Sequence, residues 1–136
     1  MIYLDANIFI YAITNTEFKG ECSRQILTKI AKKEVPGCTS LLTWDEFIHI
    51  LKKWIGREAA NIAGNKFLNF PNLTFLRVEE NVIIHAQNLM TKYNLNPRDA
   101  IHIASALVNN VTEILTDDLD FDNIKEIKRL KIEKFS

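Results

Sequence analysis

The 136-residue sequence has few of the residues that separate domains, with only four glycines and three prolines, all scattered. No linker-like, low-complexity or repeated stretch occurs, so we expect one domain over residues 1–136, large enough for a real core. No apolar run approaches the ~20 residues needed to cross a bilayer, and no basic segment followed by an apolar stretch opens the sequence. We therefore expect no membrane contact, no signal peptide and a cytoplasmic location.

The chain also lacks an excess of charge of either sign, since 17 basic residues balance 17 acidic ones. This balance argues against a protein held on nucleic acid by its overall charge, although a local patch is compatible with it. Cys22 and Cys38 are isolated and lack metal-ligand spacing, so we expect packing residues rather than a disulfide. Three dispersed histidines do not make a zinc site. The sequence has neither a glycine-rich phosphate loop nor a Gly-x-Ser-x-Gly motif.

What the sequence does contain is a series of short apolar runs that alternate with segments of helical period. Ile2–Leu4 is typical of a buried parallel strand, and "TWDEFIHILKKW" places Phe47, Ile50, Leu51 and Trp54 on one helical stripe. The same reasoning predicts further strands at 38–41, at 73–78, ending at Leu115, and at 130–135, with helices at 17–34, 57–68, 80–93, 96–108 and from about Asp120. Strands separated by helices indicate a three-layer α/β/α sandwich with a mainly parallel central sheet.

Ligands of such sheets bind beyond the carboxyl ends of the strands, and several acidic residues occur at ends of the predicted elements. Asp5 directly follows the first strand, and Asp117 and Asp118 follow the strand that ends at Leu115. Glu46 and Asp99 each lie in the first turn of a predicted helix. Four separate segments thus each place a carboxylate beside strongly apolar sequence.

Each acid also has a purely structural explanation. Thr43 to Glu46 fits a capping box, in which the glutamate reaches back to the cap amide. Asp99 gains from the positive end of the helix dipole, and Asp118 suits a turn or an N-cap. Asp5 is the hardest to explain in this way, because a turn acid need not follow so apolar a strand. We weigh the joint pattern above these separate explanations.

Carboxylates that converge within a few Å repel one another, and some would be driven into the protonated form. A divalent cation reverses that cost. Mg²⁺ and Mn²⁺ prefer oxygen ligands, and such ions polarise phosphodiesters and lower the pKa of bound water. This chemistry needs acids on separate rigid elements, which is the pattern seen here.

Four motifs in order resemble those of the PIN domain family, which includes VapC-type toxins. "YLDAN" resembles the opening strand with the family's first acid, and "SLLTWDEFIHIL" the segment with the second. "RDAIHIASAL" is similar to the helix with the third acid, and "ILTDDLDF" to the closing strand with the fourth. The resemblance covers nearly the whole chain and implies the PIN fold.

The resemblance implies that four acids act as catalytic and metal-binding residues: Asp5, Glu46, Asp99 and Asp118. Asp45 adjoins Glu46, but only Glu46 fits the family spacing. Family members hydrolyse RNA with Mg²⁺ or Mn²⁺, usually as homodimers, and toxin members bind a small antitoxin protein. We therefore expect a metal-dependent endoribonuclease, with RNA as its substrate and an antitoxin as a partner.

The same resemblance assigns supporting roles near the acids. Asn7 would orient Asp5 or a bound water molecule, and Thr116 would hydrogen-bond within the cluster. Asp118 is favoured over its neighbour Asp117 because Thr-x-Asp is the family arrangement, and Asp120 would supply a further acid outside the ligand set.

Other polar residues allow two interpretations. His102 lies three residues beyond Asp99, so it either faces the cluster or packs, and we favour packing. His49 is similarly placed beyond Glu46, and His85 is expected at the surface. Four cations on the Glu46 side either hold an RNA backbone or, as we favour, cover solvated helix faces: Lys52, Lys53, Arg57 and Lys66.

Three alternative functions compete with a toxin nuclease. A housekeeping RNA-processing nuclease would have the same motifs. A phosphatase of the haloacid dehalogenase type would use Asp5 as the nucleophile, but Asn7 occupies the position where that class needs a second acid. A non-catalytic interaction module typically loses one or more of the acids, whereas all four positions are filled here.

Overall fold

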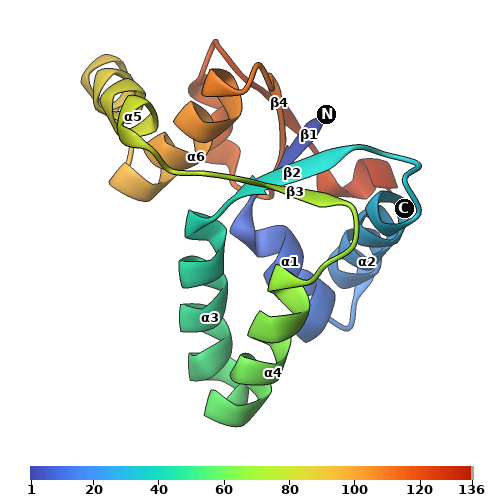
Figure 1. Cartoon of the computed structure of the whole chain (residues 1–136). Coiled ribbons are helices and arrows are strands. Elements are labelled where there is room, and N and C mark those ends of the chain that lie inside the picture. The colour runs from blue at the N-terminus through green and yellow to red at the C-terminus, as the bar shows by residue number, and fades with distance from the viewer. Residues whose placement is uncertain (136) are drawn as a thin grey trace.

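The computed structural model describes residues 1–135 and is built on a five-stranded sheet in which every strand pair is parallel (Figure 1). The strands are β1 (Ile2–Leu4), β2 (Gly37–Ser40), β3 (Leu73–Leu76), β4 (Glu113–Leu115) and β5 (Lys128–Leu130), and their spatial order is β3-β2-β1-β4-β5. The chain therefore runs from β1 to one side of the sheet and later returns to β4 on the other side. The carboxyl ends of β1 and β4 thus form the point at which the strand order reverses, where ligands of open α/β sheets bind.

Helices cover both faces of the sheet, which confirms the predicted α/β/α sandwich. One face carries α1 (Ala6–Thr14), α2 (Phe18–Ala31), α3 (Leu42–Ile55) and α4 (Arg57–Leu68), and the other carries α5 (Glu80–Lys92) and α6 (Pro97–Val108). Neighbouring residues of the central strands alternate between the two cores. Leu4 and Leu115 belong to the first core and are in register with each other, while Tyr3 and Ile114 belong to the second.

Aromatic rings join α1, α3 and α4 below the sheet. Phe67 stacks on Phe47 at a centroid distance of 5.0 Å and packs edge-on against Phe9 at 4.9 Å and Phe75 at 5.2 Å. Aromatic pairs at these distances are worth about 0.5–1.5 kcal/mol beyond the area that they bury. The cluster holds α3 rigidly against the sheet, and α3 carries Glu46.

The structure differs from the predicted elements in several places. Helix α1 was not predicted, because its consecutive buried residues Ile8, Phe9 and Ile10 mask the helical period. The last strand is Lys128–Leu130 rather than 130–135, and the remaining apolar residues form a short 3₁₀ helix, η2 (Ile132–Phe135). The predicted helix 17–34 ends at Ala31.

Two further sequence expectations can be compared with residues 1–135. Cys22 and Cys38 are free and buried, which confirms that they are packing residues. Burial raises the pKa of the Cys38 thiol to about 12, so this thiol stays protonated. Within that range, no helix has both the length and the apolar character needed to cross a membrane.

Candidate metal centre

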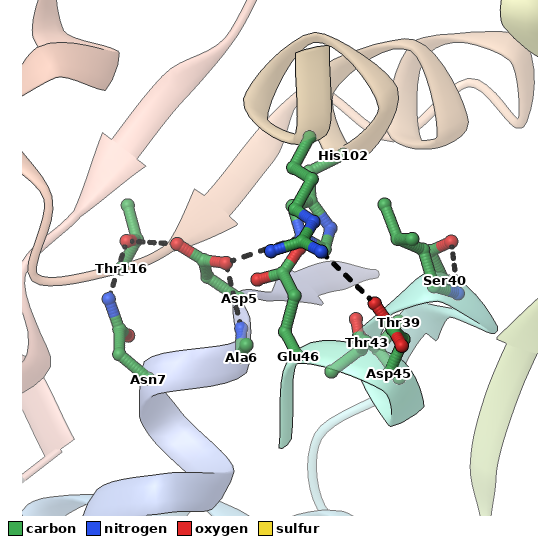
Figure 2. A network of polar contacts seen from close by, with 12 residues as sticks. Asp5, Ala6, Asn7, Thr39, Ser40, Thr43, Asp45, Glu46, His102 and Thr116 are labelled. Atoms are coloured by element: carbon green, nitrogen blue, oxygen red, sulfur yellow. Dashed lines mark hydrogen bonds and ion pairs between the residues drawn. The ribbon is translucent and has the colours of Figure 1, made fainter. Parts of the chain in front are cut away.

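Asp5 lies where β1 passes directly into α1, at the reversal point of the sheet. Its Oδ1 accepts a hydrogen bond of 2.7 Å from the backbone amide of Ala6, and its Oδ2 accepts one of 2.7 Å from the Thr116 hydroxyl (Figure 2). The residue is only 7% exposed. Asp5 is therefore the N-cap of α1 as well as a buried carboxylate whose two oxygens both have fixed directions.

Thr116, the residue after β4, connects three segments around Asp5. Besides donating to Asp5, its Oγ1 accepts hydrogen bonds of 3.1 Å from Asn7 Nδ2 and 3.1 Å from the backbone amide of Asp118. The other side-chain atom of Asn7, Oδ1, is buried without a hydrogen-bond partner. Buried polar atoms are rarely left unpaired, so this amide oxygen has spare capacity to bind a ligand.

Glu46 does not form the capping box that was the alternative explanation of its position. Helix α3 begins at Leu42 with no side-chain cap, while Thr43 is buried and shares a 2.7 Å hydrogen bond with Thr39. Glu46 instead reaches His102 Nε2 at 2.7 Å. An α-helix has 3.6 residues per turn, so Glu46 lies about one turn after the helix start at Leu42, next to the end of the sheet.

His102 was expected to pack, and the structure also brings it into contact with the acids. It is fully buried, as packing would require, yet its Nε2 also lies 3.7 Å from Asp5 Oδ1. Burial alone would lower the pKa of His102, but the hydrogen bond to Glu46 and the charges of Asp5 and Asp99 outweigh burial and raise it. The sequence feature that indicates this position of His102 is its i, i+3 spacing from Asp99, which places both side chains on one helix face.

The carboxylates form a shared electrostatic site at the carboxyl end of the sheet. Ligand atoms of Asp5, Glu46 and His102 all lie within 4.8 Å of one another, whereas those of Asp99 and Asp118 are not within that distance of all three. The pKa of Asp99 is nevertheless raised to about 6, first by burial and then by the charges of Asp5, Asp118 and Glu46, with His102 acting in the opposite direction. The charges of the other three predicted acids thus all act on Asp99.

Asp118 and its neighbour Asp117 have different surroundings. Asp117 forms a 2.7 Å ion pair with Lys19 and accepts a 3.0 Å hydrogen bond from the Tyr11 hydroxyl. Asp118 accepts a 2.9 Å hydrogen bond from the backbone amide of Asp120 and so caps the short 3₁₀ helix η1 (Leu119–Asn123). Because Asp117 is paired on the α1–α2 side, the geometry favours Asp118 as the acid that faces the cluster. Asp120 itself is exposed.

The remaining polar candidates lie outside this cluster. Asp45 pairs with Arg98 at 3.3 Å, and both side chains are more than half exposed. His49 is exposed and His85 is half-buried. The four cations are all exposed, as expected for solvated helix faces: Lys52, Lys53, Arg57 and Lys66.

The donor atoms of the site fit a hard divalent cation. They include carboxylate oxygens of Asp5 and Glu46, which lie within 4.8 Å of each other, and the unpaired amide oxygen of Asn7 belongs to the hydrogen-bonded group around Thr116. Mg²⁺ and Mn²⁺ prefer such oxygen ligands. No cysteine contributes, since both thiols are in the apolar cores. The buried group of Asp5, Glu46 and His102 could hold a metal ion.

Comparison with known proteins agrees with this fold. The family model described as "PIN domain" matches residues 2–127. The chain is 26% identical over 131 residues to "Ribonuclease VapC13" of Mycobacterium tuberculosis, covering 96% of this chain and 99% of that relative.

Two solved structures have a similar fold. VapBC2 from Rickettsia felis, bound to a DNA fragment from its promoter, has a TM-score of 0.77 and 20% identity, covering 96% of this chain and 98% of that one. A toxin–antitoxin complex from Klebsiella pneumoniae has a TM-score of 0.68 and 22% identity, covering 94% and 96%. Because the family model spans nearly the whole sequence and the parallel sheet agrees with it, the chain belongs to the PIN domain family.

Proposed function

We propose that this chain is an endoribonuclease that hydrolyses RNA phosphodiester bonds and acts as the toxin of a toxin–antitoxin pair. In this proposal Mg²⁺ or Mn²⁺ is held by Asp5, Glu46, Asp99 and Asp118. The observation that carries the proposal is that α3 and α6 bring Glu46 and His102 to Asp5 at the end of the sheet, with ligand atoms of the three residues within 4.8 Å of one another. The ribonuclease name of its 26% identical relative gives independent support.

A bound cation would polarise the phosphodiester and lower the pKa of a water molecule beside it. The chain's own residues have separate tasks in this reaction. Thr116 and the Ala6 amide hold Asp5 in one orientation. Water attacks the phosphate in line while a cluster carboxylate accepts its proton. The products are a 3′-hydroxyl and a 5′-phosphate.

The surface that suits an antitoxin is an apolar groove between α1, α3 and α4, with a volume of about 420 Å³. Exposed Ile13, Ile55 and Ile62 lie along it, and Phe9 and Phe67 form part of its lining. Exposed apolar patches of this kind mark protein-binding surfaces. The antitoxin would cover the groove with an apolar segment. A homodimer, which the family resemblance implies, is a further prediction that light scattering can check.

The proposal is tested by four single variants, Asp5→Asn, Glu46→Gln, Asp99→Asn and Asp118→Asn, with Asp45→Asn as the matched control. Asp45 adjoins Glu46 on the same helix but pairs with Arg98 at the surface. Each protein is stripped of metal, reconstituted with Mg²⁺ or Mn²⁺ and assayed for cleavage of a labelled RNA, with circular dichroism as the check on folding. Each site variant should lose at least about 100-fold in cleavage rate, whereas Asp45→Asn should keep it. Full activity of Asp5→Asn would refute the assignment.

The alternatives give different results in the same preparation. A non-catalytic module would show no tight Mn²⁺ binding by calorimetry. A phosphatase with Asp5 as nucleophile would be labelled covalently by a phosphate analogue. Asn7 argues against the phosphatase, because it donates to Thr116 where that class needs an acid.

A further inference from the structure

A buried chain of hydrogen bonds leads from the sheet to Glu46. The backbone amide of Ser40 donates to the Tyr3 hydroxyl at 3.1 Å, this hydroxyl lies 2.5 Å from His102 Nδ1, and His102 Nε2 lies 2.7 Å from Glu46 Oε1. The chain crosses β2, β1, α6 and α3, elements that are far apart in sequence. Figure 2 shows His102 reaching from α6 to a position between Asp5 and Glu46.

The direction of these hydrogen bonds follows from the donors. Because Ser40 N–H already donates to the Tyr3 oxygen, the hydrogen of the Tyr3 hydroxyl is free to point at His102 Nδ1. Tyr3 is fully buried, and burial raises the pKa of its phenol, so the hydroxyl stays protonated and remains a donor. A neutral imidazole that accepts at Nδ1 carries its proton on Nε2, and a charged imidazole carries one there too. In either form Nε2–H donates to Glu46.

This arrangement leaves Nε2 without a lone pair for a cation. Nδ1 is turned away from the acids toward Tyr3, so neither ring nitrogen is free to act as a ligand. We infer that His102, with its tautomer set by Tyr3, is a positioning residue that orients Glu46 and is not a metal ligand. The cation is then bound by oxygen atoms alone, with Glu46 Oε2 left free. The metal-binding part of this inference rests on the proposed function, and the tautomer does not.

The tautomer is measured directly by long-range ¹H–¹⁵N correlation spectra of the imidazole rings. The chain has only three histidines, so His49→Gln and His85→Gln variants assign the signals. We expect His102 to carry a proton on Nε2 in the metal-free protein and to keep it at saturating Mg²⁺. A deprotonated Nε2 in either state would overturn the inference. In Tyr3→Phe, which retains the ring but lacks the hydroxyl, a second population with the proton on Nδ1 should appear.

Calorimetric titration with Mn²⁺ then separates positioning from ligation. His102→Gln keeps an N–H donor for Glu46 and should bind Mn²⁺ within about 3-fold of the wild type, whereas His102→Leu should bind about 10–100-fold more weakly, the usual range for partners of metal ligands. His49→Gln is the matched control, because His49 lies three residues beyond Glu46 but is exposed. Equal large losses in both His102 variants would indicate ligation and overturn the inference.

Activity measurements distinguish this inference from the proposed function. Loss of positioning should lower the kcat of RNA cleavage in His102→Leu with little change in KM, and His102→Gln should restore most of the kcat. If the wild type bound no Mn²⁺ and cleaved no RNA, the proposed function would fail, while the tautomer in the metal-free protein would still be decided by the spectra.

Discussion

Asp99 makes the stability of the metal-free protein depend on pH, and replacing it with Asn should remove that dependence. Its pKa is about 6 in the folded protein against an ordinary value of 3.8. Between these values the folded state binds more protons than the unfolded state, so the free energy of unfolding falls as the pH rises. Above about pH 6 Asp99 is ionised in both states, and the free energy of unfolding that its ionisation removes has been lost in full.

The magnitude follows from the size of the pKa difference. At 1.36 kcal/mol per pKa unit, an interval from 3.8 to about 6 sets an upper limit of about 3 kcal/mol. Asp99 is partly exposed, and solvent screening reduces this to about 1–2 kcal/mol. The Asp99→Asn variant should therefore be more stable than the wild type by about that amount near pH 7.5 and nearly equal to it near pH 4.

Urea unfolding in the presence of a chelator measures this difference, with Asp45→Asn as a control that should show no such pH dependence. The raised pKa of His102 also makes the free energy of unfolding fall as the pH rises above 6.5, and this contribution is smaller in Asp99→Asn because the Asp99 charge is one of the causes that raise that pKa. Excess Mg²⁺ should restore the wild type by about 2.7 kcal/mol at 100 times its Kd. If the difference between wild type and Asp99→Asn were the same at both pH values, the carboxylates would not be coupled as described.

Three further changes test the supporting structure. Thr116→Val keeps the shape but removes the hydroxyl that holds Asp5, so we expect about 1–3 kcal/mol less stability in urea and weaker Mn²⁺ binding by calorimetry; unchanged binding would show that this hydrogen bond is dispensable. Gly20→Ala places a Cβ 1.8 Å from the Asn15 carbonyl oxygen, and the midpoint of thermal unfolding should fall by several degrees, about 4 °C for each kcal/mol. Phe47→Ala removes one ring from the aromatic cluster and should lower the free energy of unfolding in urea by about 3–5 kcal/mol. A decrease below about 1 kcal/mol would contradict tight packing there.

The regular elements of the core could be predicted because their period is written in neighbouring residues. The run Ile2–Leu4 and the stripe on α3 each need only local sequence to be recognised. Helix α1 could not be found in this way, since a helix that is apolar on several sides has no period to detect. Strand β5 was placed too late because it reads Lys-Arg-Leu, and edge strands tolerate charged residues that central strands exclude.

The same distinction between local sequence and tertiary structure applies to the residues of the site. The positions of Asp5 and Asp118 at strand ends follow from the chain order, because parallel strands bring their carboxyl ends to one edge. The direction in which each side chain points cannot be predicted from the chain order. Adjacent acids such as Asp117 and Asp118 are equivalent in sequence, and only the ion pair of Asp117 with Lys19 distinguishes them in the fold.

By itself the sequence determined most of the strands and helices and which acids lie at their ends, because both depend on the spacing of apolar residues along the chain. Only the tertiary structure decided that Tyr3, His102 and Glu46 form one hydrogen-bonded chain. The physical reason is that hydrogen bonds require donor and acceptor within about 3 Å in a defined direction. Residues 3, 46 and 102 meet that requirement only after helices α3 and α6 have packed onto the sheet.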